Sequence, residues 1–142
     1  MKAFSLSIVF FVLLLITLTG CKKEDNPVNP SSNIKEILTS GTWRVTYFFD
    51  DKDETNHFTG YTFTFLNNGT VTASNNITTV NGTWNTGTDD SNNKLYLNFV
   101  SNTTFEELNE DWHVIEKLNN KIRLEHISGG SGGTDYLTFE KN

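Results

Sequence analysis

The chain has 142 residues and a formal charge of −6, from 11 Lys and Arg against 17 Asp and Glu residues. Nucleic-acid binding requires clustered Lys and Arg side chains that displace counterions, so this charge disfavours a nucleic-acid partner. The single cysteine excludes an intramolecular disulfide and any Cys-X-X-Cys redox or zinc motif.

The N-terminus reads as an export signal. Met1-Lys2 is followed by a largely apolar stretch from Ala3 to Leu18, which is shorter than the roughly 20 residues that a spanning helix needs. Leu18-Thr19-Gly20-Cys21 resembles the lipobox of bacterial lipoproteins, in which the chain is cleaved before the cysteine and the thiol carries diacylglycerol. We therefore expect residues 1–20 to be a cleaved lipoprotein signal peptide and Cys21 to be the lipid attachment site. An ordinary signal peptide or an uncleaved anchor is the alternative.

Cleavage before Cys21 would leave 142 − 20 = 122 residues, with 11 − 1 = 10 basic against 17 acidic side chains and a charge of about −7. Residues 21–32 contain both prolines of the chain and read as a lipidated, flexible tether. Lys22-Lys23-Glu24-Asp25 resembles the surface-export signal of Bacteroidota lipoproteins. The expected location is the cell envelope, lipid-anchored in the outer membrane, with surface exposure as a further expectation.

Residues 33–142 form the predicted folded domain. A short helical turn should begin near Asn33 and bury Ile34, Ile37 and Leu38. Beyond it the apolar residues recur with period two, which predicts β-strands. The first strand should point alternate side chains inward, namely Trp43, Val45, Tyr47 and Phe49. Later strands are predicted around 61–65, 71–74, 80–84, 95–99, 112–118, 121–127 and 136–140, with polar loops at 86–93 and 101–111.

The segment from Phe105 to Leu118 fits helical spacing as well as a strand, and we favour a turn through Glu110 followed by a strand. This strand should pair with 121–127 as a hairpin. A two-residue loop would split the apolar residues between both faces, whereas an odd-length loop ending at Asn120 places them on one face. The residues that would share this face are Trp112, Val114, Ile122 and Leu124.

About eight strands with short polar connections predict an all-β antiparallel meander that closes into a barrel or curls into a sandwich. A parallel α/β architecture is excluded because crossover helices are missing.

A family resemblance agrees with this architecture. Gly41-Thr42-Trp43 resembles the Gly-X-Trp signature of lipocalins, and the chain as a whole resembles the lipocalin-like lipoproteins of Bacteroidota. The lipobox, the tether, Gly82-Thr83-Trp84 and the 112–124 hairpin carry this resemblance. It implies an eight-stranded barrel with one open mouth that binds an apolar ligand. It also implies an arginine late in the chain that packs on Trp43, and the sequence departs from this pattern because only Lys141 stands near that place.

Chemical motifs are sparse. The three histidines share no short metal-ligand spacing, and no serine lies in a nucleophile-elbow context. The acidic run 50–54 lacks the glycine and the final glutamate of a calcium loop, so we read it as a solvated hairpin loop. We therefore expect no catalytic residue, no metal site, no cofactor and no enzymatic activity.

Two functions remain. The first is a membrane-anchored carrier of a small apolar or amphipathic ligand, with inward polar and aromatic groups that orient it. The residues expected to bind that ligand are Tyr47, Tyr61, Trp84, Trp112, Glu116 and His126, and His57 shares a face with Tyr61. The alternative is an interaction or inhibitor module with a packed core and a protein or glycan partner, because an eight-stranded barrel is narrow enough for side chains to fill.

Overall fold

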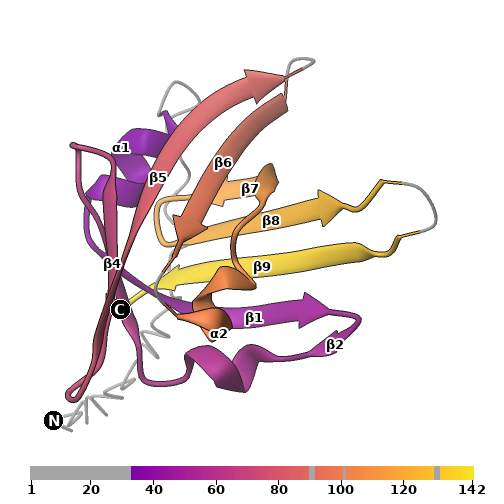
Figure 1. The fold of residues 1–142 in the computed structure, drawn as a ribbon. Helices are drawn as coiled ribbons and strands as arrows, with labels where there is room; N and C mark the ends of the chain where they lie inside the picture. Colours follow the sequence, from indigo (N-terminus) through magenta and orange to yellow (C-terminus); the bar gives the residue numbers. More distant parts are fainter. Residues whose placement is uncertain (1–32, 90–91, 101, 130–131) are drawn as a thin grey trace, which may run out of the picture.

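The computed structural model describes residues 33–142 except 90–91, 101 and 130–131. In this part of the chain, antiparallel strands form one sheet in the order β2-β1-β3-β4-β5-β6-β7-β8-β9, and β1 also pairs with β9. This last pairing closes the sheet into a barrel of eight strands, with the two-residue β2 outside it (Figure 1). The predicted all-β antiparallel barrel is confirmed, and the sandwich alternative is not what forms. The expected signal peptide and tether lie outside the described residues.

The elements follow one another with short connections. Their bounds are α1 Ile34–Thr39, β1 Thr42–Asp50, β2 Lys52–Asp53, the 3-10 helix η1 Thr55–Phe58, β3 Thr62–Phe65, β4 Thr70–Ser74, β5 Thr79–Asp89, β6 Asn92–Phe99, α2 Thr103–Glu106, β7 Asp111–Leu118, β8 Lys121–Ile127 and β9 Thr134–Lys141. The expected polar loop at 86–93 is instead the end of the β5–β6 ladder, which pairs as far as Asp89 and Asn92. The expected loop at 101–111 contains α2.

A β-bulge in β1 changes which side chains face the interior. Trp43 and Val45 point inward as predicted, but the pairing of β1 with β9 shifts register between Val45 and Tyr47. Beyond the shift Phe48 is fully buried, while Tyr47 is 39% exposed. The expectation that Tyr47 and Phe49 line the interior is therefore wrong, because one extra residue in a strand moves every later side chain to the opposite face.

A second bulge governs the β7–β8 hairpin. Leu118 pairs directly with Lys121, so the loop has two residues and the predicted odd-length loop is wrong. The register instead shifts between Val114 and Glu116, which brings Val114 opposite Leu124. The predicted common face is confirmed, since Val114 packs against a core that contains the other three residues of that face. The extra residue is absorbed within the strand rather than in the turn.

Aromatic side chains fill the barrel. The largest fully buried residues are Trp43, Trp112, Phe48, Phe58, Phe63, Phe65, Phe99, Phe105 and Phe139. Each of the three tryptophans donates its indole Nε1–H to a backbone carbonyl, at 2.8 to 3.0 Å, so no indole N–H is left unsatisfied in the interior. A lysine takes the place where the family resemblance implies an arginine, since Lys141 Nζ lies 5.3 Å from the centroid of the Trp43 ring.

Short helices cover both ends of this core. At the start of β1, α1 buries its apolar face, and the Leu38 carbonyl accepts the Trp43 indole N–H. Near the end of β1, Phe58 of η1 and Phe105 of α2 are each 1% exposed and meet edge to face at 5.4 Å. The open mouth implied by the lipocalin resemblance is thus closed by aromatic rings in the described part of the chain.

Candidate functional site

The hollows described by the structure lie on the outside of the barrel. One of them, of about 600 Å³, is lined by Arg44, Glu116, Leu118, Asn120, Lys121, Glu140, Lys141 and Asn142. None of these lining residues belongs to the aromatic core. The hollow is therefore a polar groove with charges of both signs, which does not suit an apolar ligand.

Glu116 and His126, predicted to share an inward face, lie far apart. Glu116 borders the polar groove, where its carboxylate is 3.8 Å from Lys121 Nζ and 3.9 Å from an Arg123 guanidinium nitrogen. His126 lies at the other end of the hairpin, where it pairs with Asp135. The bulge after Val114 separates Glu116 from the predicted face, so the two side chains cannot contact one ligand in the interior.

Of the predicted aromatic ligand-binding residues, the two tryptophans belong to the core and the two tyrosines do not. Trp84 and Trp112 are 5% and 0% exposed and use their indole N–H groups internally. Tyr61 packs edge to face on Phe105 at 5.0 Å. Tyr47 points outward and lies beside Phe49. Of the predicted set, Glu116 lies beside two basic side chains and His126 among three carboxylates.

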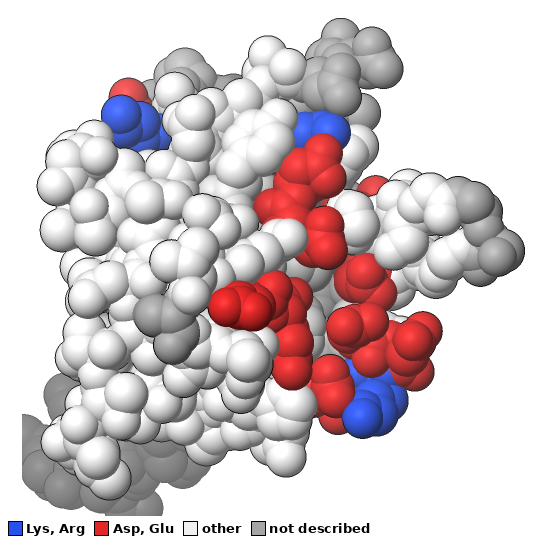
Figure 2. All heavy atoms as spheres, viewed as in Figure 1, with Lys and Arg blue, Asp and Glu red and all other residues white. Residues whose placement is uncertain are grey.

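Chain topology gathers acidic residues at one end of the barrel. In an antiparallel sheet the end of one strand lies beside the start of its neighbour, so the end of β1, the start of β9, the end of β8 and the start of β7 share one edge. Figure 2 shows the resulting band of carboxylates on this side of the molecule. We call it the acidic rim and define it as Asp50, Asp51, Glu54, Glu107, Glu110, Asp111 and Asp135.

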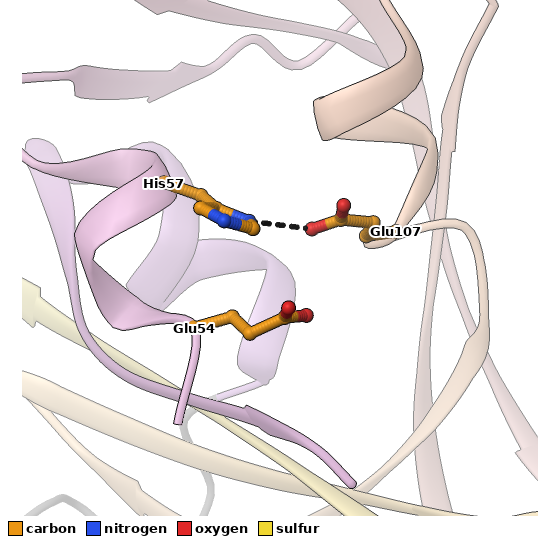
Figure 3. A group of neighbouring side chains, drawn as sticks. All are labelled: Glu54, His57 and Glu107. Carbon is orange, nitrogen blue, oxygen red and sulfur yellow. Dashed lines mark hydrogen bonds and ion pairs between the residues drawn. The ribbon is translucent and has the colours of Figure 1, made fainter. Parts of the chain in front are cut away.

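One histidine of the rim lies between η1 and α2. Glu54, His57 and Glu107 point toward a common space (Figure 3), with potential ligand atoms within 4.8 Å of one another. His57 Nδ1 lies 3.0 Å from Glu107 Oε2, and Lys52 Nζ lies 2.9 Å from Glu54 Oε1. The lysine already neutralises Glu54, and Glu107 is hydrogen-bonded to the ring.

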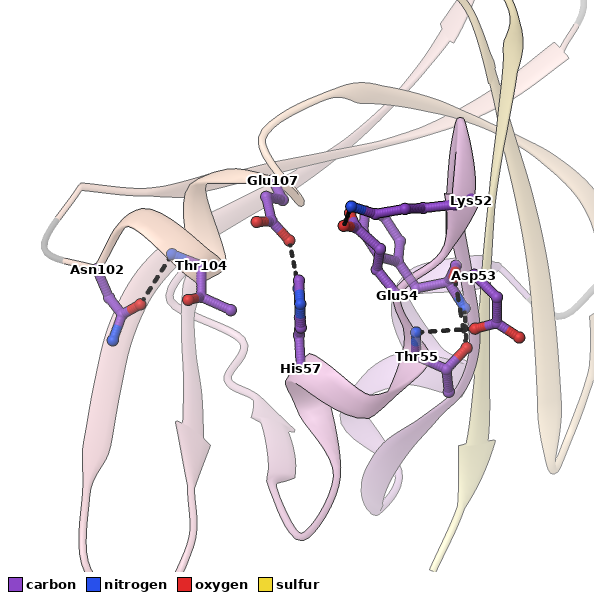
Figure 4. A network of polar contacts seen from close by, with 9 residues as sticks. Lys52, Asp53, Glu54, Thr55, His57, Asn102, Thr104 and Glu107 are labelled. Carbon is purple, nitrogen blue, oxygen red and sulfur yellow. Dashed lines mark hydrogen bonds and ion pairs between the residues drawn. The ribbon is translucent and has the colours of Figure 1, made fainter.

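Local capping fixes the two short helices that carry this group. Asp53 Oδ1 accepts the backbone N–H of Thr55, and Thr55 Oγ1 accepts the N–H of Phe48, which ties η1 to the end of β1 (Figure 4). Asn102 Oδ1 accepts the N–H of Thr104 at 3.1 Å and begins α2. These hydrogen bonds hold His57 and Glu107 on facing elements, although they are 50 residues apart in sequence.

The second histidine group is denser in charge. His126 Nε2 lies 3.3 Å from Glu110 Oε2 and 3.6 Å from Asp111 Oδ1, and its Nδ1 lies 3.4 Å from Asp135 Oδ2. The other oxygen of Asp111 accepts a 2.6 Å hydrogen bond from Lys94 Nζ. The ring also packs against Trp112, with centroids 6.2 Å apart. This group combines one imidazole with carboxylates, which is a donor set that metal ions use.

The rim carries an excess of negative charge. Burial raises the pKa of Asp50, and repulsion by Asp135, Asp51, Glu54 and Glu107 raises it further. The hydrogen bond from Lys94 lowers the pKa of Asp111 against the opposing effect of burial. The rim is therefore a surface on which added positive charge is favourable.

Comparison with known proteins supports the fold alone. No protein-family model matches the chain, and no curated protein matches it. The structure is similar to the crystal structure of a DUF4847 family protein from Bacteroides vulgatus ATCC 8482, with a TM-score of 0.53 and 22% sequence identity over 78% of this chain and 98% of that one. Among the described residues, no helix has the length and hydropathy needed to cross a membrane.

Neither of the two histidine groups was predicted from the sequence. The prediction of no metal site rested on the lack of a short common spacing among the histidines, but His57 and His126 each meet carboxylates from other elements. The available signal was indirect: acidic residues are concentrated at 50–54 and 106–111, on either side of predicted strands. Only the closed strand order brings these two segments to one edge.

Proposed function

We propose that this chain is a membrane-anchored binding protein of the cell envelope, without enzymatic activity, which contacts a basic partner through its acidic rim. The observation that carries the proposal is the contrast between a barrel filled by aromatic rings and a rim crowded with carboxylates. Electrostatic complementarity of this kind steers association and selects partners by charge.

The packed core is the reason for preferring a surface partner to an apolar ligand. Ligand pockets for small molecules have volumes of about 300–1,000 Å³ and are mostly apolar. The space inside this barrel is occupied by rings that pack edge to face, and their polar atoms are already paired. An interior carrier would have to expel a ring such as Phe105. Native mass spectrometry after incubation with a fatty-acid panel tests this alternative, and a stoichiometric bound lipid would favour it.

Lipidation of Cys21 is the second part of the proposal. The lipobox-like residues 18–21 support it, and two or three acyl chains at about 0.8 kcal/mol per buried methylene would anchor the protein stably. Metabolic labelling with radioactive palmitate in a bacterial host tests it. We expect labelled protein in the membrane fraction and loss of label in Cys21→Ser. Label retained by that variant would refute attachment at Cys21.

The positions of α1 and the rim on the barrel suggest how the rim would face relative to the membrane. The chain enters the barrel at α1, beside the start of β1, whereas the rim lies at the end of β1. With 9 residues, β1 spans about 30 Å at roughly 3.3 Å per residue. A tether that reaches the membrane from α1 would therefore hold the rim on the side away from the bilayer.

Fluorescence anisotropy with a labelled oligolysine peptide tests the rim. The protein is expressed from the full-length chain and extracted in a neutral detergent. We expect the triple variant Glu54→Gln, Glu107→Gln, Asp135→Asn to weaken binding about tenfold at low salt, since three rim charges are lost.

A second triple variant controls for net charge. Glu36→Gln, Glu116→Gln and Glu140→Gln remove the same number of charges away from the rim and should change binding little. An equal loss of affinity in both variants would show that net charge binds the peptide rather than the rim, and would refute the proposal.

A further inference from the structure

We propose that Glu110, Asp111 and His126 bind a divalent first-row transition-metal cation, and that Asp135 positions the His126 ring. This site lies within the acidic rim and deepens the proposed function, on which it rests for the view that the rim is the binding surface. The ligand atoms come from the segment before β7, from the start of β7 and from the end of β8. They lie within 4.8 Å of one another.

The distances around His126 Nε2 leave room for a metal ion between the ring and two carboxylates. A charge-assisted N–H···O hydrogen bond measures about 2.7–2.9 Å, and Lys94 meets Asp111 at 2.6 Å within the same group. The two carboxylate oxygens facing Nε2 are more distant, at 3.3 and 3.6 Å. Ligands bound about 2.0–2.1 Å from a tetrahedral zinc ion lie about 3.3 Å from one another. A metal therefore fits between these atoms with small adjustments.

The second nitrogen of the ring supplies the orienting contact. Asp135 Oδ2 lies 3.4 Å from Nδ1 and can accept its proton. In that tautomer the Nε2 lone pair points toward Glu110 and Asp111, so that a cation between them would meet one nitrogen and two carboxylate ligands. A carboxylate behind a histidine ligand is the usual outer contact of zinc sites, where it fixes the ring and raises its basicity. Trp112 restrains the ring from the side.

Charge balance also favours a divalent ion. Glu110, Asp111 and Asp135 contribute three negative charges and Lys94 one positive charge, so the group with a neutral His126 carries −3 + 1 = −2. A 2+ cation makes the group neutral. The His126 side chain is 17% exposed, whereas Glu110 and Asp111 are 41% and 44% exposed. The histidine ligand is therefore mostly buried, and the two carboxylates face solvent. Coordination positions on the solvent side remain for water or for a donor atom of the partner.

The His57 group is the natural comparison within the same rim. Its Glu54 is engaged by Lys52, and its ring nitrogen Nδ1 makes a 3.0 Å contact with Glu107. The His126 ring, by contrast, meets carboxylates at both nitrogens, with Asp135 at Nδ1 and Glu110 and Asp111 at Nε2. We therefore assign the stronger site to His126 and use His57 as an internal control.

Isothermal titration with Zn²⁺, after removal of metals with EDTA, tests the site in detergent-extracted protein expressed from the full-length chain. We expect one zinc ion per chain with a dissociation constant below about 100 μM. Co²⁺ should give visible absorption bands of a site with nitrogen and oxygen ligands. Asp135→Asn should weaken zinc binding about 10- to 100-fold, the usual effect of losing an outer-shell partner.

Matched variants make the assignment specific. His126→Ala and Glu110→Gln should each weaken zinc binding at least tenfold, whereas His57→Ala and His113→Ala should leave it within about twofold. Circular-dichroism melts confirm that each variant is folded, and Glu110→Gln provides a test at a half-exposed position if His126→Ala unfolds. Absence of zinc binding in the wild type, unchanged binding in both His126→Ala and Glu110→Gln, or loss of binding in His57→Ala would overturn the assignment.

The two proposals fail in different ways. If zinc does not bind but the rim triple variant still loses oligolysine affinity, only the metal site is refuted. If zinc binds through His126 but the two triple variants bind the peptide equally, only the proposed function of the rim is refuted.

Discussion

Replacement of Gly82 by alanine tests how tightly the barrel wall is packed. Gly82 of β5 lies opposite Phe99 of β6 in the ladder. A Cβ atom added at Gly82 would lie 2.6 Å from Cδ1 of Phe99 and 2.7 Å from the backbone oxygen of Asn98. Phe99 is fully buried and packs on Phe105 at 5.3 Å, so its ring has no free space to enter.

Gly87 of the same strand provides the matched control. A Cβ added there would meet Cε2 of Tyr96 at 3.1 Å, but the Tyr96 side chain is 38% exposed and can swing into solvent. Both Gly→Ala changes reduce the entropy of the unfolded chain, which stabilises by about 0.4–1 kcal/mol in each case. The difference between the two variants therefore isolates the steric term.

Overpacking a core costs about 1–3 kcal/mol, which is the expected difference in unfolding free energy between Gly82→Ala and Gly87→Ala. For a domain of about 100 residues this lowers the melting temperature by roughly 4–12 °C. Urea unfolding followed by tryptophan fluorescence measures the free energy, and circular-dichroism melts measure the temperature. If Gly82→Ala melts within about 1 °C of Gly87→Ala, the close packing of Phe99 against β5 is refuted.

Three further substitutions and two deletions test the bulges and the rim. Phe48→Ala should cost about 3–5 kcal/mol of unfolding free energy and Tyr47→Ala about 1 kcal/mol or less; the reverse order in urea unfolding would refute the bulge in β1. Because the pKa of Asp50 is raised in the folded state, stability is lost as pH rises from the ordinary aspartate pKa of about 3.9 through the folded pKa. Asp50→Asn measured in EDTA should therefore raise the melting temperature at pH 7 but not at pH 3, and equal melting temperatures at pH 7 would contradict this. Deletion of Ile115 keeps the ladder pairs on both sides of the bulge and should be tolerated. Deletion of Glu125 from β8, which has no bulge, should turn a buried neighbour outward, at a cost of about 1.5–3 kcal/mol. Similar melting temperatures for the two deletion variants would refute the register of the β7–β8 hairpin.

Much of the fold could be predicted from local patterns. Period-two alternation identifies strands wherever one face is buried, and Gly41-Thr42-Trp43 with Lys141 correctly anticipated the packing at the start of β1. The two bulges could not be predicted, because a one-residue register shift leaves no mark in the composition of a strand. Tyr47 and Phe49 are as apolar and aromatic as Phe48, so the alternation alone favours the wrong pair.

The histidine groups show a different limit of sequence reasoning. His126 meets Glu110, Asp111 and Asp135 only because the end of β8 lies between the starts of β7 and β9. A search for short spacings cannot find such a group. A search for acidic residues at predicted strand ends, combined with an antiparallel barrel, would have placed them at one edge.

Both the filled core and the charged rim follow from which side chains point into the barrel and which lie at the ends of its strands. In a barrel of eight strands the inward positions hold either a small ligand or side chains, and here aromatic rings occupy them. The three indole N–H groups are each bound to a carbonyl near an end of the barrel or a turn, which holds the rings in place. An interior packed in this way holds the ends of the strands in place. Because α1 and the rim lie at opposite ends of β1, the proposed anchor before α1 would leave the rim on the remote side, free for the proposed partner.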